Sequence, residues 1–334
     1  MGKATPVVGD RDPAPRGAPA PAHAGAEPRT SVIVCAFSDA RWDALCAAVA
    51  SIDAQSHPAH QAIVVIDHNP GLLARARARF TGATVIENSG RPGLSGARNS
   101  GIKAATGEVV AFLDDDAVAD PGWLEALARG FADPRVLGAG GAVDPLWAAG
   151  RPAWFPAEFD WVVGCAHNGM PTGRTAVRNV IGANMAFRAE ALRALDGFRE
   201  GIGRVGAVPL GCEETDLCIR ARQRWPSAEV LYDPAARVEH LVPPDRGSLR
   251  YFLSRCRAEG RSKALLARFV GAADGLSDER AYTARTLPRG VLRGLRDALH
   301  GDLAGLRRAG AIVLGLATTT LGYASGRLAR EGHG

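Results

Sequence analysis

The chain has 334 residues, of which 46% are hydrophobic and 22% are charged, so it has the composition of an ordinary globular protein and is long enough for one large α/β domain with a smaller appendage. Its six cysteines form no CxxC pair and no Cys/His set at zinc-site spacing, which argues against a disulfide framework and a structural zinc, and fits reduced thiols in the cytosol. The net charge of +5 divides into −4 over residues 1–245 and +9 over residues 246–334, so the C-terminal region is basic.

The first 29 residues are rich in Pro, Ala and Gly and contain no apolar run of the signal-peptide type. Prolines at this density break regular elements, so the sequence predicts a disordered tail over 1–29. Order is expected from residue 30, where short β-branched apolar runs begin to alternate with segments of helical spacing. Strands are predicted at 31–36, 62–66, 83–86 and 108–113, and helices at 40–54, 72–80 and 93–105. This alternation predicts a mostly parallel sheet covered by helices on both faces.

After residue 145 the alternation gives way to a segment, 145–173, that contains Trp147, Trp154 and Trp161 among prolines and glycines. We expect a structured loop or lid there, whose tryptophans either pack internally or offer a flat surface to a sugar ring. Farther along the chain, the sequence predicts an extended segment at 177–187, helices at 189–195 and 213–224, and a short strand at 230–232.

Three consecutive acids, Asp114, Asp115 and Asp116, follow the apolar run 109–113. Ligands of open α/β sheets bind beyond the carboxyl ends of strands, and three acids there repel one another unless a cation neutralises them. Because oxygen ligands suit Mg²⁺ or Mn²⁺, and Mg²⁺ is often held together with substrate phosphates, the cluster favours a metal that binds a phosphorylated substrate. A solvated acidic turn that caps the next helix is the alternative.

Two features upstream of the acids point toward the same chemistry. Asp67 ends a predicted strand, where a carboxylate can accept hydrogen bonds from a ribose or a base. The segment 93–99 places Arg98 in a helix that opens with small residues, which permit close backbone approach, and Arg98 can neutralise a phosphate. Each feature alone also fits an ordinary helix entrance.

A second acidic cluster follows Gly211 and contains Glu213, Glu214 and Asp216 at the start of a predicted helix. Acids in a first helical turn interact favourably with the helix dipole, which explains their presence there without any role in catalysis. Near a polyphosphate site, neighbouring carboxylates also raise each other's pKa, so that one of them can take a proton near neutral pH as a general base.

The order of these segments resembles that of the family 2 glycosyltransferases. The matching stretches span about residues 30–241 and read, in chain order, SVIVCAFSDARWDAL, AIVVIDHNPGLL, GLSGARNSGIKAATGEVVAFLDDDAV, IGANMAFRAEALRALDGF, GCEETDLCIRA and VLYDPAARVEH. The resemblance implies a GT-A fold over residues 30–245, with a Rossmann-like, mostly parallel central sheet and helices on both faces. Residues 246–334 are expected to form a basic helical C-terminal extension.

The resemblance also implies roles for individual residues. The three acids match the DXD motif, so Mg²⁺ or Mn²⁺ is expected to be held by Asp114, Asp116 and His240. Nucleotide-sugar binding is expected to fall to residues at strand ends and helix starts: Ala36, Phe37, Asp67, Arg98, Asp115, Gly182 and Asn184.

Glu213 and Glu214 match the Glu-Asp pair of the family, whose second acid is the base. The resemblance therefore implies Glu214 as the catalytic base, with Glu213 beside it. Because a glutamate at the second position is one methylene longer than the usual aspartate, Asp216 is the alternative base.

The activity implied by the resemblance is metal-dependent, inverting transfer of a hexose or deoxyhexose from a nucleotide-diphosphate sugar to an acceptor hydroxyl. The acceptor is expected to be a saccharide or a lipid-linked molecule, in the assembly of cell-envelope polysaccharide or glycoconjugates. The alternatives are a nucleotidyltransferase, for which residues 37–41 make a poor triphosphate loop, and a polyprenyl-phosphate sugar synthase of the same fold.

The basic region after residue 246 contains five leucines at steps of three and four, which predict one apolar helical face: Leu292, Leu295, Leu299, Leu303 and Leu306. This helix either packs on the catalytic domain or lies on an anionic membrane surface. The uncharged stretch 309–326 is short for a membrane span, so we expect a cytoplasmic protein that is peripheral at the inner face of the cell membrane. No nucleic-acid partner is expected, because the basic region lacks interleaved aromatic residues.

Overall fold

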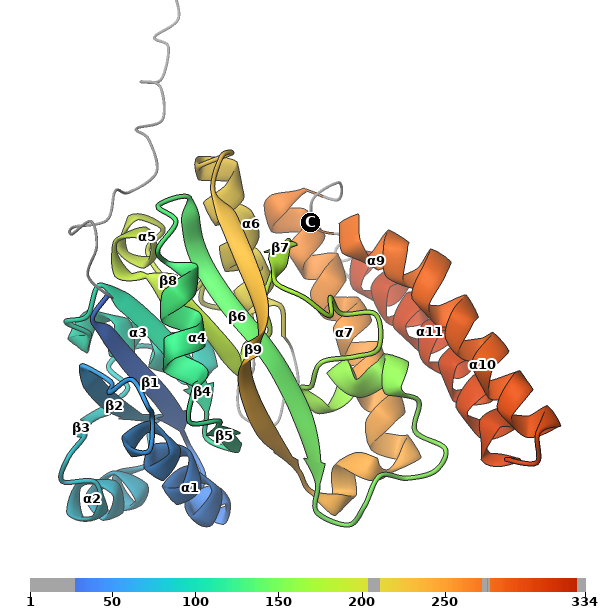
Figure 1. Ribbon diagram of the computed structural model, residues 1–334, viewed down its shortest axis with the longest axis horizontal. Helices are drawn as coiled ribbons and strands as arrows, with labels where there is room; N and C mark the ends of the chain where they lie inside the picture. The colour runs from blue at the N-terminus through green and yellow to red at the C-terminus, as the bar shows by residue number, and fades with distance from the viewer. Residues whose placement is uncertain (1–27, 204–210, 272–274, 276, 329–334) are drawn as a thin grey trace, which may run out of the picture.

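The computed structural model describes residues 28–203, 211–271, 275 and 277–328. The predicted disordered tail therefore lies outside the described residues, apart from its last two positions. A mixed central sheet occupies one side of the molecule, and a group of long C-terminal helices occupies the other (Figure 1).

The first half of the described chain forms the parallel part of the sheet. Strands β1 (Thr30–Ala36), β2 (Gln61–Ile66), β3 (Thr84–Glu87) and β4 (Val109–Asp114) alternate with helices α1 (Trp42–Asp53), α2 (Pro70–Arg79) and α3 (Leu94–Ala104). These strands pair in parallel in the order β3-β2-β1-β4. Val32 and Val34 join one buried cluster and Ile33 joins another, so β1 is buried on both faces. Burial on both faces produces the unbroken apolar runs from which β1, β2 and β4 were predicted, whereas β3 is a partly exposed edge strand; all four predicted strands are confirmed.

The second half of the sheet is different in character. It contains β5 (Ala117–Ala119), β6 (Val136–Trp147), β7 (Thr175–Val177), β8 (Asn184–Arg188) and β9 (Glu229–Val242). Across the described residues, four strand pairs are parallel and four are antiparallel. The sheet is therefore mixed, and the expectation of a mostly parallel sheet holds only for its first half.

Strand β9 is much longer than the predicted strand at 230–232. The sequence Asp233-Pro234 has the composition of a turn, which is why the prediction stopped there. In the structure, the register of β6 against β9 shifts between Gly141 and Val143, so a bulge absorbs the extra residues and the pairing resumes. The continued strand pairs His240 with Ala117, directly after the three acids.

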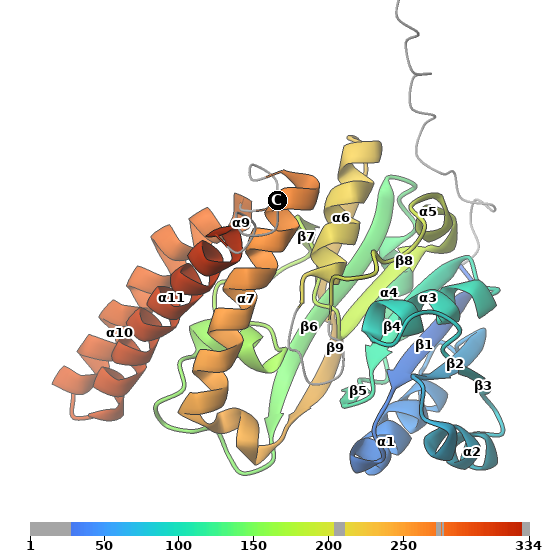
Figure 2. The ribbon, with the colours of Figure 1, turned by 180° about the vertical axis from the view of Figure 1, so that it is seen from behind.

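Helices α4 (Trp123–Gly130), α5 (Ala189–Ala194) and α6 (Glu213–Arg224) complete the part of the molecule that surrounds the sheet, together with the 3₁₀ turns η1 (Asp39–Arg41) and η2 (Ala157–Val163). Figure 2 shows α3 and α6 on the same side of the sheet. The predicted loop at 145–173 is largely irregular, but β6 extends into it as far as Trp147.

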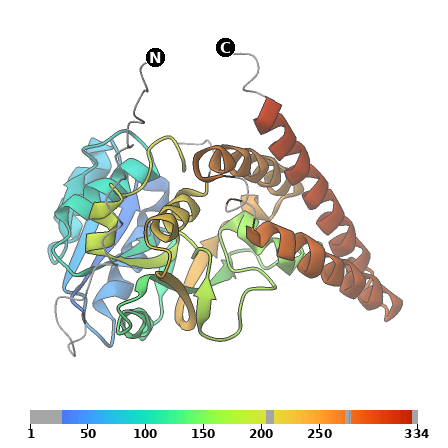
Figure 3. The same ribbon diagram turned by 90° about the horizontal axis from the view of Figure 1, so that it is seen from above.

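The C-terminal region is helical, as predicted. It contains η3 (Pro244–Gly247), α7 (Leu249–Val270), α9 (Ser277–Ala281), the π-helical turn η4 (Tyr282–Thr286), α10 (Leu287–Leu299) and α11 (Ala304–Leu328). Helix α7 contacts α6 and α11, and α10 and α11 form an antiparallel hairpin. The turn of this hairpin points away from the sheet (Figure 3). Among the described residues, no helix combines the length and the apolar character needed to cross a bilayer.

Candidate active site

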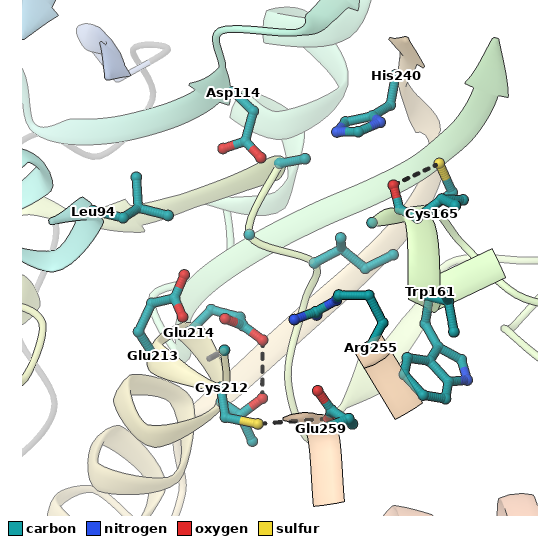
Figure 4. A pocket seen from close by; sticks show the side chains of 18 of the residues that line it. Leu94, Asp114, Trp161, Cys165, Cys212, Glu213, Glu214, His240, Arg255 and Glu259 are labelled. Atoms are coloured by element: carbon teal, nitrogen blue, oxygen red, sulfur yellow. Dashed lines mark hydrogen bonds between the residues drawn. The ribbon is translucent and has the colours of Figure 1, made fainter. Parts of the chain in front are cut away.

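A cavity of about 780 Å³ lies where the carboxyl ends of β1, β2 and β4 face the C-terminal helices. The helix starts of α3 and α6 and the loop that contains η2 also contribute to its walls. This is the position at which ligands bind in open α/β sheets. Figure 4 shows Asp114 and His240 in the upper part of the view, Glu213 and Glu214 at the lower left, Arg255 near the middle and Glu259 at the bottom.

Ala36 and Phe37, at the end of β1, line the sheet side of the cavity together with Asp67, at the end of β2. The carboxylate of Asp67 accepts a hydrogen bond of 2.8 Å from the backbone nitrogen of Gly93 and one of 2.7 Å from Nδ2 of Asn88. Gly93 has a φ of 123°, a conformation that a residue with a side chain rarely adopts. Asp67 therefore ties the end of β2 to the entrance of α3.

Arg98 is 2% exposed and contacts three of the predicted site residues. Its Nη1 donates a hydrogen bond of 2.8 Å to Oε1 of Glu213, while Nη2 donates to the carbonyl oxygen of Gly182 at 3.0 Å and to Oδ1 of Asp114 at 3.3 Å. In this arrangement Arg98 holds the end of β4 and the start of α6 together and compensates a carboxylate from each.

Asp114, Asp116 and His240 form a group of potential metal ligands. Each offers one ligand atom, and these atoms lie within 4.8 Å of one another. Nδ1 of His240 is buried and has no hydrogen-bond partner among the described residues. Two carboxylates and an imidazole form a donor set that fits a divalent cation, and the carboxylates suit Mg²⁺ or Mn²⁺. The predicted metal-binding character of the site is confirmed by this cluster.

Two arginines that the sequence analysis did not assign to the site also contact the acids. Nη1 of Arg41 lies 2.7 Å from Oδ1 of Asp115 and 3.3 Å from Oδ2 of Asp116, and Nη2 of Arg246 lies 3.3 Å from Oδ2 of Asp116. Burial alone would raise the pKa of Asp116, but His240, Arg41 and Arg246 outweigh it and hold that pKa below its ordinary value. Asp116 therefore stays ionised, as a metal ligand must.

Asp115 occupies a different environment from its neighbour. Burial raises its pKa to about 6, although Arg41 opposes the shift. Its Oδ2 is buried and has no hydrogen-bond partner among the described residues. A buried, unpaired carboxylate oxygen that faces a cavity is available to accept a hydrogen bond from a ligand hydroxyl.

Glu213 and Glu214 both line the cavity at the start of α6. Glu213 is paired with Arg98. Burial raises the pKa of Glu214 to about 7, and the charge of Glu213 adds to the shift. Glu214 therefore exchanges a proton readily near neutral pH, which is the property that general-base catalysis requires.

Asp216 and Asn184, two of the predicted site residues, do not belong to the cavity wall, and neither side chain has any exposed surface. Asp216 contacts Arg199 at 3.2 Å and Arg220 at 2.7 Å. Asn184 donates to the carbonyl oxygens of Ala142 and Ala236 and accepts a hydrogen bond from Nε1 of Trp123. Both side chains hold neighbouring elements in place, and Gly182 and Ala183 are the residues of the 182–184 motif that line the cavity.

The cavity continues past Glu214 into an arm that the sequence analysis did not foresee. Its walls come from helix α7, the π-helical turn η4 and helix α11, and contain Arg255, Glu259, Lys263, Tyr282, Leu316 and Thr320. The nitrogen of Lys263 lies 2.6 Å from Glu279 and 3.4 Å from Glu259. These residues fall outside the motifs of the catalytic domain, and no pattern in the sequence singled them out. We call this part of the cavity the helical arm.

The three tryptophans of the 145–173 segment divide between packing and the cavity. Trp147 and Trp154 are partly buried and pack against Phe155, the first edge to face and the second at a tilt. Trp161 lines the cavity, and its Nε1 donates a hydrogen bond of 3.0 Å to the hydroxyl of Tyr282 in η4. The loop is therefore fastened to the wall of the helical arm.

Comparison with known proteins gives consistent results. The family model described as "Glycosyl transferase family 2" matches residues 31–196. The chain is 30% identical over 305 residues to the glucosyl-dolichyl phosphate glucuronosyltransferase of Haloferax volcanii, a match that covers 90% of this chain and 96% of that protein. It is also 30% identical over 191 residues to the pre-mycofactocin glycosyltransferase of Mycobacterium tuberculosis, covering 55% of this chain and 37% of the relative.

Two solved structures show the same fold. The mannosyltransferase PcManGT from Pyrobaculum calidifontis, solved with GDP-Man and Mn²⁺, superposes with a TM-score of 0.55 at 20% identity, covering 89% of this chain and 88% of that one. GalNAc-T7, solved with UDP, GalNAc and Mn²⁺, gives a TM-score of 0.51 at 18% identity, covering 70% and 48% respectively. The predicted GT-A fold is confirmed.

Proposed function

The chain belongs to glycosyl transferase family 2, and from this membership and the geometry of the cavity we propose that it moves a hexose or deoxyhexose from a nucleotide-diphosphate sugar to an acceptor hydroxyl with inversion. Glu214 is the general base, Asp114, Asp116 and His240 hold the metal, and the sheet side of the cavity holds the nucleotide. The helical arm receives the acceptor.

One observation carries the proposal. A carboxylate with a pKa of about 7, Glu214, lies in a single cavity between a potential metal site and a second, helical arm (Figure 4). A transferase needs its base at the boundary between donor and acceptor, because the base must reach the hydroxyl that attacks. The position of Glu214 meets this requirement.

The reaction follows from these positions as a single displacement. Glu214 takes the proton of the acceptor hydroxyl as its oxygen forms a bond to the anomeric carbon of the sugar. The bond between that carbon and the diphosphate oxygen breaks on the opposite face, and the electron pair leaves with the nucleoside diphosphate. Attack opposite the leaving group inverts the configuration at the anomeric carbon.

The charged residues of the chain prepare the site for the leaving diphosphate. A divalent ion held by Asp114, Asp116 and His240 would neutralise negative charge on the diphosphate. Arg98, fixed by Gly182 and Glu213, places a guanidinium beside Asp114, and Arg41 and Arg246 place two more beside Asp116. Ala36, Phe37, Asp67 and Asp115 are assigned to the nucleoside.

The presence of a base distinguishes between two acceptor classes. A polyprenyl phosphate would attack through an oxygen that is already ionised at neutral pH, so a polyprenyl-phosphate sugar synthase has no need for a residue such as Glu214. A hydroxyl must lose its proton during attack. The cavity therefore supports a hydroxyl acceptor, on a saccharide or on a lipid-linked saccharide, and the name of the Haloferax volcanii relative describes a lipid-linked molecule.

We assign the reaction to the cytoplasm, at the inner face of the cell membrane, in the assembly of cell-envelope polysaccharide or glycoconjugates. The six cysteines are free, which supports a reducing compartment. The basic C-terminal helices support an anionic membrane surface as a partner.

A donor screen tests this function. The purified protein is incubated with individual nucleotide sugars and Mn²⁺ or Mg²⁺, and release of nucleoside diphosphate is measured with and without saccharide acceptors. Transfer from one donor class, with a product of inverted anomeric configuration by NMR, is the expected result. A product that retains the donor configuration contradicts the mechanism.

A further inference from the structure

The contact between α10 and α11 is made of small side chains. Gly290, Gly294, Gly305 and Ala309 are buried at this contact, together with Ile312. A Cβ atom placed on Gly294 would overlap the carbonyl oxygen of Gly305, and one placed on Gly305 would overlap that of Gly294. The two backbones approach closely, and the hairpin therefore packs through its glycines and not through its leucines.

As a consequence, most leucines of the hairpin face away from the protein; the exceptions are Leu287, which is buried, and Leu316, which lines the cavity. From the sequence, the five leucines at helical spacing, Leu292 to Leu306, could either pack on the catalytic domain or face outward, and in the structure all five are exposed. The exposed fraction is 87% for Leu299, 71% for Leu303 and 70% for Leu321. Other large apolar side chains exposed on the same hairpin are Leu292, Leu295, Leu306, Val313, Leu314 and Leu328. Soluble proteins rarely expose so many neighbouring apolar side chains, which mark interaction surfaces.

The charge of the hairpin is distributed in a specific way. Between Arg308 and Arg327, every residue of α11 is uncharged, so its outward side carries no formal charge over nearly its whole length. Arg289, Arg296 and Arg307 are exposed beside the leucines of α10 and of the hairpin turn. An apolar strip bordered by arginines is the pattern of a helix that lies in the interface of a bilayer and binds anionic headgroups.

The helical arm of the cavity reaches this apolar strip. Leu316 and Thr320 line the cavity and are also exposed, and they lie on α11 between the buried contact and the outward leucines. The wall of the arm also includes Thr319 and Tyr323 of the same helix. The cavity that contains Glu214 therefore adjoins the surface that the hairpin presents to its surroundings.

We propose that the α10–α11 hairpin docks on an anionic bilayer through its outward leucines and thereby places the helical arm at the membrane surface, where it receives an acceptor whose lipid remains in the bilayer. The docking surface comprises Leu292, Leu299, Leu303, Val313 and Leu321 with Arg289, Arg296 and Arg307. The choice of acceptor rests on the proposed function, whereas the docking itself does not.

Vesicle flotation tests the docking without donor or acceptor. The full chain is mixed with vesicles of phosphatidylglycerol and phosphatidylcholine in equal amounts, or of phosphatidylcholine alone, and the floating fraction is measured. We expect flotation with the anionic vesicles and a strong decrease at high salt. The Leu299→Gln/Leu321→Gln variant should lose membrane affinity by about tenfold or more for each inserted leucine.

A matched control places the same substitutions on exposed leucines elsewhere. Leu146 and Leu249 are each 48% exposed, on β6 and at the start of α7, and Leu146→Gln/Leu249→Gln should float like the wild type. The Arg289→Gln/Arg296→Gln variant should lose affinity for anionic vesicles by about fivefold per arginine. Its control, Arg77→Gln/Arg222→Gln, changes exposed helix positions of the catalytic domain and should keep the affinity of the wild type. Because Leu299 is almost fully exposed, Leu299→Gln alone leaves the packing intact and should give an intermediate loss.

Two outcomes overturn the proposal. The first is a wild-type chain that stays in the dense fraction with both vesicle types. The second is a wild-type chain that does not float and that light scattering shows to be a dimer. If the Leu299→Gln/Leu321→Gln substitutions dissociate that dimer, the leucines bind a second copy of the chain and not a bilayer. Flotation without any transferase activity would leave the docking intact and contradict the proposed function instead.

Discussion

Nη1 of Arg98 donates a hydrogen bond of 2.8 Å to Oε1 of Glu213, although 115 residues separate the two in the chain. Because of this contact, the two adjacent glutamates have different electrostatic environments. Glu213 is compensated by a guanidinium, whereas Glu214 is held by burial and by the charge of Glu213 at a pKa of about 7. The pair therefore contains one carboxylate that fixes Arg98 and one that is free to exchange a proton.

The pKa of Glu214 sets the acid limb of the pH profile. A general base must be ionised, so kcat/KM should fall about tenfold for each pH unit below about 7. The measurement is kcat/KM against pH with saturating metal, with a parallel titration of nucleoside-diphosphate binding to separate chemistry from binding. An acid limb near the ordinary value of a glutamate, 4.5, would contradict a raised pKa for the base.

The same pKa has a consequence for stability. In the folded chain the pKa of Glu214 is about 7, above the ordinary 4.5 expected when unfolded, so the folded state binds more protons between these values. The stabilising contribution of the neutral carboxyl is complete below about pH 4.5 and is lost as the pH rises through about 7. The Glu214→Gln variant should therefore gain melting temperature over the wild type at about pH 8 and much less at about pH 5.

The control for this comparison is Glu190→Gln, an exposed glutamate in the first turn of α5. It should change the melting temperature equally at both pH values. An equal effect of Glu214→Gln at the two pH values would mean that burial does not perturb this carboxyl.

The metal cluster predicts a selective loss of ion binding. Asp116→Asn and His240→Ala each remove one of three donors, so the Mn²⁺-dependent increase in melting temperature should disappear or shrink to the level of nonspecific binding. A titration of free Mn²⁺ by electron paramagnetic resonance measures the affinity directly. The control variant Asp144→Asn, on β6 outside the cluster, should bind Mn²⁺ like the wild type. Unchanged Mn²⁺ affinity in Asp116→Asn and His240→Ala would show that these residues do not hold the metal.

Asp216 should behave as a structural residue. It is fully buried beside Arg199 and Arg220, both of which keep some solvent exposure, so Asp216→Asn removes their carboxylate and should destabilise the fold by about 1–3 kcal/mol. Chemical denaturation measures this loss. The turnover of the molecules that remain folded should stay within about threefold of the wild type. A loss of turnover comparable to that of Glu214→Gln would instead identify Asp216 as the catalytic base.

The sequence was sufficient to predict the elements whose residues are buried on both faces. Strands β1, β2 and β4 appear as short apolar runs because each is covered by helices above and below. Strand β9 was not predictable in full, because it pairs through a bulge near Pro234 that depends on the register of β6. Local composition contains no information about such a partner.

In the candidate site, too, some residues were predictable from the sequence and others depend on tertiary contacts. The acids Asp114 and Asp116, His240 and the Glu213–Glu214 pair were found through motif order, and the structure brings them to one cavity. Arg41 and Arg246 escaped notice because each reaches the acids only through tertiary contact: Arg41 lies in the first motif stretch but has no assigned role there, and Arg246 lies outside the motifs. The outward orientation of Leu299 depends on the glycines of the opposite helix, and helical periodicity alone identifies an apolar face without saying what it contacts.

The most direct test of the account is transfer by the Glu214→Gln variant, compared with the wild type and with Glu190→Gln, at saturating donor, acceptor and metal. We expect nucleoside-diphosphate affinity and Mn²⁺ affinity to remain within about twofold, while turnover falls on the order of 10²-fold or more because the acceptor hydroxyl has no base. Near-normal turnover by Glu214→Gln would contradict it.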